Sequence, residues 1–134
     1  YYMDVERRIL MIQWFNKNDK KMMATIYPTN ITINKPGLDK ISHAYACMVG
    51  IDEEEKKIAI RPLTKTQFDS HLFDEGSIFV LSGGKTYTRI SSTEFVNVIS
   101  DLLGYDFKNG VKKFSCTYDD ESDMLMIDLT KEVI

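Results

Sequence analysis

Hydrophobic and polar residues alternate along several short stretches of this chain, a pattern typical of β-strands with one buried face. The clearest examples are "NITIN" at residues 30–34, "IAIRPL" at residues 58–63 and "DMLMIDL" at residues 123–129. The pattern therefore predicts a chain rich in strands. In the last stretch the better core face consists of Leu125, Ile127 and Leu129.

One longer stretch has helical spacing instead. Its apolar residues fall at i, i+3, i+4, i+7 and i+8, which places them on one helix face. These residues are Phe95, Val98, Ile99, Leu102 and Leu103. The run Ser91–Glu94 before them is typical of a capping box, and Gly104 is a natural helix end. The pattern predicts a helix over about residues 92–103, anchored in the core by Phe95, Ile99 and Leu102.

A shorter helix is predicted after Asn34, because asparagine is a favoured N-cap and Pro36 follows where a first-turn proline is tolerated. Two hairpins are also predicted. The leading hairpin spans about residues 8–27. The middle hairpin spans about residues 77–90 and turns at Ser82–Gly84, where glycine tolerates positive φ.

Two segments of the chain carry the same order of elements, at about residues 31–65 and 86–131. In each, a strand leads into a capped helix, and a strand, an acidic turn and an alternating strand then end in Leu-Thr-Lys. One such unit buries too little apolar surface to fold alone, whereas two can share a core. We therefore predict a single domain over residues 1–134, strand-rich and of the α+β class, built from two tandem strand-helix-hairpin units.

The first unit resembles the swapped-hairpin domains of the AbrB and MazE type. The stretches that carry the resemblance are "NITINKPGLDKI" (30–41) and "MVGIDEEEKKIAIRPL" (48–63). In that family two chains interlock to form one barrel, so the resemblance implies that the tandem copies form a pseudo-dimeric barrel or packed sheets. It also implies a non-enzymatic regulatory module whose partner is DNA or another protein. A homo-oligomer stays open as an alternative.

The residues that contact DNA in that family are mostly replaced here. "YPTN" (27–30) stands where the family has a Gly-Arg turn, and Asp39-Lys40 stands in place of an arginine pair. If nucleic acid binds, basic residues in and beside the first unit are the expected phosphate contacts, with Trp14 or Tyr87 available for base stacking. The candidate nucleic-acid-binding residues are Lys35, Lys40, Lys56, Lys57 and Arg61.

Composition limits the classes of partner. The 134 residues carry a net charge of −3, which gives no general attraction to nucleic acid or anionic membranes. Hydrophobic residues at 43% and charged residues at 28% argue against intrinsic disorder. No stretch approaches the roughly 18 apolar residues of a membrane span, and the start shows no cleavable signal pattern. A cytoplasmic protein without a membrane partner is therefore expected.

No catalytic, cofactor-binding or metal-binding residues are predicted. Asp69, Ser70 and His71 are adjacent in sequence, whereas a catalytic triad is assembled in space. The acidic turns at residues 52–55 and 119–123 lack the spacing of a calcium loop. Two alternatives to a binding module stay open: a small enzyme or ligand-binding domain whose site is scattered in sequence, and a structural subunit of an assembly.

The two cysteines, Cys47 and Cys116, belong to neither a CxxC motif nor a metal-ligand spacing. Partly buried thiols are therefore the expected state of both, with a disulfide or a reactive thiol as the alternative.

Overall fold

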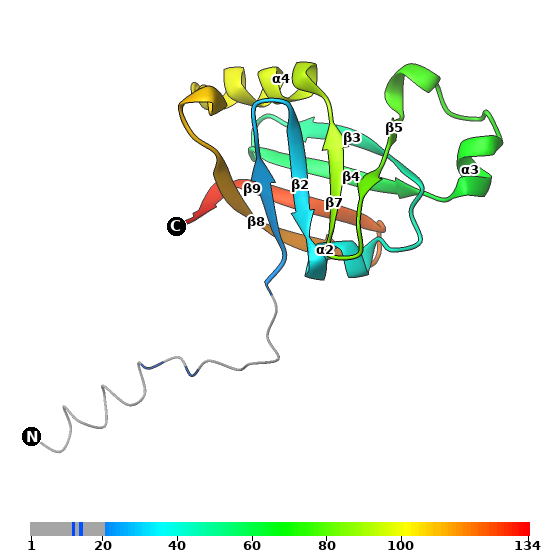
Figure 1. Cartoon of the computed structure of the whole chain (residues 1–134), viewed down its shortest axis with the longest axis horizontal. Helices are drawn as coiled ribbons and strands as arrows, with labels where there is room; N and C mark the ends of the chain where they lie inside the picture. Colours follow the sequence, from blue (N-terminus) through cyan, green and yellow to red (C-terminus); the bar gives the residue numbers. More distant parts are fainter. Residues whose placement is uncertain (1–11, 13, 15–20) are drawn as a thin grey trace, which may run out of the picture.

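The structure is a computed structural model that describes residues 12, 14 and 21–134 (Figure 1). Within them, nine strands form one sheet in the order β5-β3-β4-β9-β8-β1-β2-β7-β6, and every pairing is antiparallel. The strands are β1 (Met23–Ile26), β2 (Asn30–Asn34), β3 (Ala46–Asp52), β4 (Lys57–Leu63), β5 (Phe79–Val80), β6 (Ser82–Gly83), β7 (Tyr87–Ser91), β8 (Lys112–Asp119) and β9 (Met124–Val133). The helices are α2 (Lys35–Lys40), α3 (Lys65–Asp69) and α4 (Thr93–Leu103), with 3-10 turns η1 (Glu75–Ser77) and η2 (Phe107–Asn109).

The sheet curls into a nearly closed barrel because one short segment touches both of its edges. β5 and β6 are separated only by Leu81. Val80 of β5 lies opposite Ala46 in β3, whereas Ser82 of β6 lies opposite Arg89 in β7. Residues 79–83 therefore connect β3 to β7, pairing with two residues of each edge strand. We call residues 79–83 the closing segment.

Alternation along the strands places one face of the sheet in a continuous core. In β2, Ile31 and Ile33 are buried, while Thr32 between them lies on the outer face. Isoleucine is well suited to this position, since its branched side chain packs on a pleated surface. The predicted core face of β9 is confirmed, because Leu125, Ile127 and Leu129 are buried.

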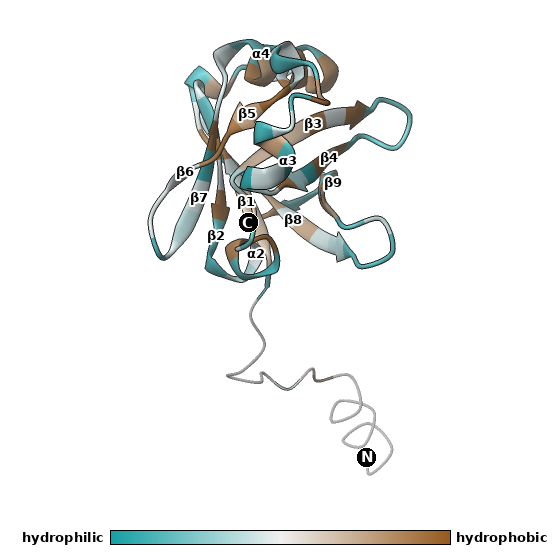
Figure 2. Cartoon of the chain, turned by 90° about the vertical axis from the view of Figure 1, so that its right-hand side faces the viewer, coloured by the Kyte–Doolittle hydropathy of each residue, from teal (hydrophilic) through white to brown (hydrophobic). Residues whose placement is uncertain are grey.

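Helices cover the two ends of the barrel, with α4 at one end and α2 at the other (Figures 1 and 2). The predicted short helix after Asn34 is confirmed as α2, and the Asn34 side chain accepts a hydrogen bond from the Gly37 amide. The predicted end of the longer helix is also confirmed. Gly104 adopts a left-handed φ of 63°, and its amide donates to the carbonyl of Ser100.

The start of α4 and one residue of its predicted apolar stripe differ from the prediction. Ser91 is still the last residue of β7, paired with Asn30, so the N-cap is Ser92, whose hydroxyl accepts from the Phe95 amide. The predicted capping box at Ser91–Glu94 is therefore wrong by one residue. Val96 and Ile99 are the buried residues of α4, whereas Val98 is 51% exposed. The three predicted anchors do face the core: Ile99 is fully buried, and Phe95 and Leu102 are partly buried against it.

The predicted fold of two tandem strand-helix-hairpin units is wrong, because the strands of both segments belong to one sheet. β2 pairs with β7, and β4 pairs with β9, so strands from the two segments are neighbours. β1, which lies before both segments, sits between β8 and β2. The chain is mixed and strand-rich, and the described residues form one nearly closed antiparallel sheet rather than two paired units.

The leading hairpin predicted at residues 8–27 falls partly outside the described residues. Its second strand corresponds to β1, and the first strand lies on residues whose structure is not described. In the middle of the chain, β6 and β7 are paired through Ser82–Arg89 and Gly83–Thr88. Among the helices that the structure describes, none combines the length and apolar character that crossing a membrane requires.

Candidate functional site

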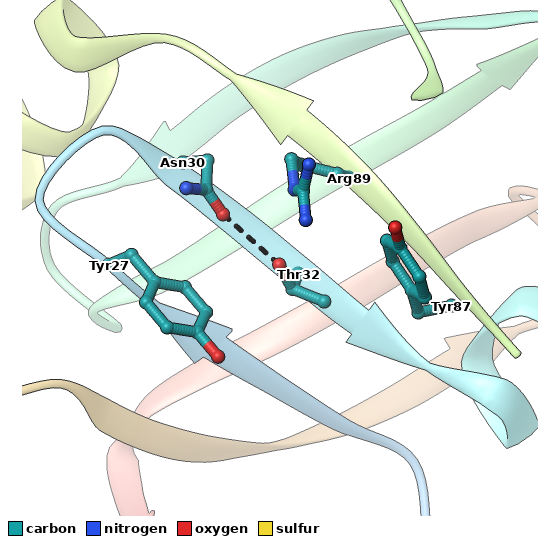
Figure 3. A pocket seen from close by; sticks show the side chains of 5 residues that line it. All are labelled: Tyr27, Asn30, Thr32, Tyr87 and Arg89. Carbon is teal, nitrogen blue, oxygen red and sulfur yellow. Dashed lines mark hydrogen bonds between the residues drawn. The ribbon is translucent and has the colours of Figure 1, made fainter. Parts of the chain in front are cut away.

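A shallow hollow of about 410 Å³ lies on the outer face of β2 and β7, next to the end of β1 (Figure 3). The side chains that line it are Tyr27, Asn30, Thr32, Tyr87 and Arg89. We call these five residues the Arg89 hollow. Strand alternation positions them, because Tyr87 and Arg89 point outward on either side of the buried Thr88.

Strand register sets the relative positions within the Arg89 hollow. Thr32 in β2 lies directly opposite Arg89 in β7, and Asn34 lies opposite Tyr87. Figure 3 shows Tyr27 and Tyr87 on either side of Thr32, with the Arg89 guanidinium between Asn30 and Tyr87 and directed toward Thr32. The arrangement is a polar floor between two phenol rings, with a cation along one edge.

Hydrogen bonds hold the floor in a fixed orientation. The Thr32 hydroxyl donates to Oδ1 of Asn30 at 3.1 Å, and Nδ2 of Asn30 donates to the Thr29 hydroxyl at 3.2 Å. The oxygen of Thr32 therefore keeps lone pairs that can accept from a ligand. The floor is pre-organised, which lowers the entropy lost when a ligand binds.

Arg89 provides the charge of the hollow. Its guanidinium carbon lies 5.3 Å from the centroid of the Tyr87 ring, a cation–π contact that fixes the side chain over the ring. Nε of Arg89 is buried and makes no hydrogen bond within the described part of the chain. That atom is closed off from the surface, so the part of Arg89 available to a ligand is the rest of the guanidinium, where the side chain lines the hollow.

The lining contains no opposing charge. Among the described residues, no carboxylate borders the hollow, and its titratable groups are Arg89 and the two phenols. A guanidinium donates in a planar fork that matches a phosphate or a carboxylate. The chemistry of the hollow therefore fits an anionic group attached to a planar or apolar body, since the two rings offer faces for stacking.

Two of the predicted nucleic-acid contacts lie on α2, at the end of the barrel away from α4 (Figure 1). Lys35 forms an ion pair with Asp39, one turn further along the helix. The ammonium group of Lys40 lies 5.8 Å from the ring centroid of Tyr118. Both side chains therefore have partners in the protein, and neither lines the Arg89 hollow.

The other three predicted contacts lie on or beside β4. Lys56 is in the turn between β3 and β4, which is hydrophilic in Figure 2, and it has a left-handed φ of 53°. Lys57 and Arg61 share the outer face of β4, and Arg61 is exposed opposite Met48. The structure thus brings Lys57 and Arg61 to one face but separates them from the two lysines of α2.

Acidic neighbours offset the charge of Lys57. It lies opposite Asp52 in β3 and opposite Asp128 in β9. A hydrogen bond from the Thr130 hydroxyl and, more weakly, the charges of Lys131 and Lys57 hold the pKa of Asp128 below its usual value, against the opposing effect of desolvation. Asp128 therefore stays ionised, and the attraction of Lys57 for a phosphate is reduced.

The other side chains that could take part in catalysis or metal binding do not gather into a site. Nε2 of His43 lies 3.8 Å from a carboxylate oxygen of Asp123, and both side chains are about half exposed. The Ser70 hydroxyl donates to the backbone carbonyl of Gln67, so the adjacent Asp69 and His71 do not activate it. Among the described residues, no three His, Cys, Asp or Glu side chains gather closely enough to hold a metal ion.

Both cysteines are free thiols, and they are more deeply buried than predicted; this burial raises the pKa of Cys47 and Cys116 to about 12. Because the thiolate is the reactive form, we expect neither thiol of the native chain to react with an aromatic disulfide reagent at about pH 8. Both are expected to react rapidly once guanidinium unfolds the barrel. Prompt release of one equivalent from the native chain, followed by spectrophotometry, would contradict this expectation.

Comparisons of the chain with protein-family models, with curated proteins and with solved structures return no significant match. The chemistry of the site therefore rests on the residues of this chain alone.

Among the five residues of the Arg89 hollow, the sequence analysis proposed only Tyr87 as a possible ligand contact. Arg89 lies between Thr88 and Ile90, whose side chains are buried in the core. Because side chains alternate along a strand, Arg89 points outward. Tyr27, Asn30 and Thr32 join it only because β2 pairs with β7, which alternation in single strands does not show.

Proposed function

We propose that this chain is a non-enzymatic cytoplasmic binding module that recognises an anionic partner on the outer face of β2 and β7. The observation that carries the proposal is Arg89, whose side chain lines a hollow that no acidic residue of the described part of the chain borders. The lining supplies stacking faces and hydrogen bonds rather than the paired proton donor and acceptor that acid–base catalysis needs.

Nucleic acid is the partner that the proposal favours. Phosphate fits the guanidinium fork, and the two phenol rings offer surfaces for bases. A protein is the second candidate, because the carboxylates of an acidic peptide satisfy the same guanidinium.

A direct test compares Arg89→Gln with Arg61→Gln. Both variants remove one arginine charge from an outer strand face, but only Arg89 lines the hollow. We expect Arg89→Gln to weaken binding of a fluorescein-labelled oligonucleotide at least about tenfold, since a charge-assisted hydrogen bond contributes about 1.5–3 kcal/mol. Arg61→Gln is expected to stay within about twofold of the parent chain, because it lies outside the hollow.

The same anisotropy assay decides between the hollow and the set predicted from the sequence. If Lys56 and Lys57 carry the binding, a Lys56→Gln/Lys57→Gln double variant reduces the slope of log affinity against log salt by about one for each phosphate that is no longer neutralised. Equal binding by Arg89→Gln and the parent chain would overturn the role of the hollow. The binding function as a whole falls if neither DNA nor an oligoglutamate peptide binds at low salt.

A further inference from the structure

The outer face holds a row of side chains that extends the Arg89 hollow across four strands. Arg89 lies opposite Thr32, Thr32 lies opposite Thr25, and Thr25 lies opposite Lys113 in β8. Antiparallel strands are about 4.8 Å apart, so the Cα atoms of Arg89 and Lys113 are separated by roughly 14 Å along the curved sheet. The row therefore has a cation at each end and two threonines between them.

Lys113, like Arg89, has no acidic partner among the described residues. It is exposed, and it forms no ion pair with any residue that the structure describes. Its cross-strand neighbour in β9 is Val133, which carries no side-chain charge. The adjacent Lys112, by contrast, pairs with Glu132 at 3.3 Å. Two unopposed cations thus lie on one line that runs across the strands.

The aromatic residues sit beside this line. Tyr27 is 38% exposed, and Tyr87 is half-buried under Arg89. Their rings flank Thr32 on opposite sides (Figure 3). The two rings lie at opposite ends of the hollow (Figure 3). A base placed over Thr32 therefore lies beside one of them and near the oxygens of Thr32 and Asn30, while the phosphate attached to it lies near Arg89.

From this arrangement we infer that the chain binds single-stranded nucleic acid across β7, β2, β1 and β8. One base lies between Tyr27 and Tyr87, one phosphate pairs with Arg89, and a phosphate a few nucleotides away pairs with Lys113. This inference rests on the proposed function and specifies its ligand.

Single strands fit this surface better than a duplex does. In a duplex the bases are stacked on one another and shielded, so the two phenol rings would have no base face to contact. In a single strand the bases can splay out and stack on aromatic side chains, with the backbone following a line of cations. The net charge of −3 adds no long-range attraction, so these local contacts carry the affinity.

The salt dependence gives a quantitative expectation. Each phosphate neutralised on a single strand contributes about −0.7 to the slope of log affinity against log salt. Two contacts therefore predict a slope of about −1.4 for the parent chain, and about −0.7 for either Arg89→Gln or Lys113→Gln. The change separates a direct phosphate contact from a structural role, since a residue that merely supports the fold would lower affinity without halving the slope.

The test uses the full chain with fluorescein-labelled eight-nucleotide dT and U probes and a duplex of the same length, between about 50 and 200 mM salt. Tyr27→Leu and Tyr87→Leu are expected to weaken single-strand binding about fivefold or more each, whereas Tyr87→Phe keeps the ring and stays within about twofold of the parent. Comparison of the dT and U probes distinguishes DNA from RNA as the source of the strand.

The outcomes separate this inference from the proposed function. Duplex binding as tight as single-strand binding, or leucine variants that bind like the parent chain, overturns the single-strand inference. If oligoglutamate or duplex DNA binds in a way that depends on Arg89 and the single strands do not bind, the proposed function stands and the single-strand inference is wrong. If no anionic probe binds at low salt, both fall.

Discussion

Replacing Ile99 with alanine is expected to lower the free energy of unfolding by about 2–4 kcal/mol. The side chain is fully buried, and it joins α4 to the core at one end of the barrel. Its removal loses the transfer free energy of the buried methyl groups and leaves a cavity, because the surrounding strands are paired on both sides and cannot collapse inward. Urea denaturation followed by far-ultraviolet circular dichroism measures the change.

Val98→Ala is the matched control, because Val98 is the adjacent residue of the same helix but is 51% exposed. We expect a change of less than about 1 kcal/mol, partly offset by the better helix propensity of alanine. Asn97→Ala, also at an exposed position, is expected to behave similarly. If the Ile99 and Val98 variants shift the midpoint equally, the face of α4 assigned to the core is wrong.

Local patterns identified the positions of several elements and the core anchors of α4, but not every residue of its buried face. The spacing of apolar residues placed a helix at the right part of the chain, and Gly104 ended it as expected. The spacing also grouped Val98 with Ile99, although Val96 occupies the buried position. A helix with apolar residues over a wide arc can turn either part inward, and the packing against the barrel decides which part is buried.

Pairing between distant strands is what the sequence pattern did not contain. Alternation showed which face of β9 is buried, because that property belongs to a single strand. It did not show that β2 pairs with β7, that β1 lies between β8 and β2, or that residues 79–83 close the barrel. These pairings join segments far apart in the chain, so the similar order of elements in two segments led to the wrong architecture.

The candidate site also depends on strand pairing that the sequence pattern does not show. The basic residues chosen from the sequence were grouped by proximity along the chain, yet Lys35 pairs with Asp39, and Lys57 lies between two aspartates. Arg89 and Lys113 are distant in sequence, and only the register of four strands aligns them. Charge on a sheet surface depends on cross-strand neighbours, which a linear reading does not supply.

Replacing Gly83 with alanine is expected to destabilise the chain by about 2–3 kcal/mol, because the closing segment needs a residue without a side chain there. Gly83 has a φ of 129°, which L-residues rarely adopt. A Cβ at this position would lie 2.6 Å from the Tyr87 carbonyl oxygen and 3.0 Å from the Thr88 Cα. Both atoms are backbone of a paired strand, so relief of the clash requires β6 to move away from β7.

Gly84→Ala serves as the control for this variant, since a Cβ at Gly84 would meet only the edge of the Tyr87 ring, at 3.7 Å. We expect Gly84→Ala to change the free energy of unfolding by less than about 1 kcal/mol in the same urea titration. Because the clash at Gly83 includes the Tyr87 backbone, Gly83→Ala is also expected to displace that ring from the Arg89 hollow and to weaken oligonucleotide binding at temperatures where the chain is still folded. Equal stability of the two alanine variants would show that the closing segment does not constrain the barrel in this way.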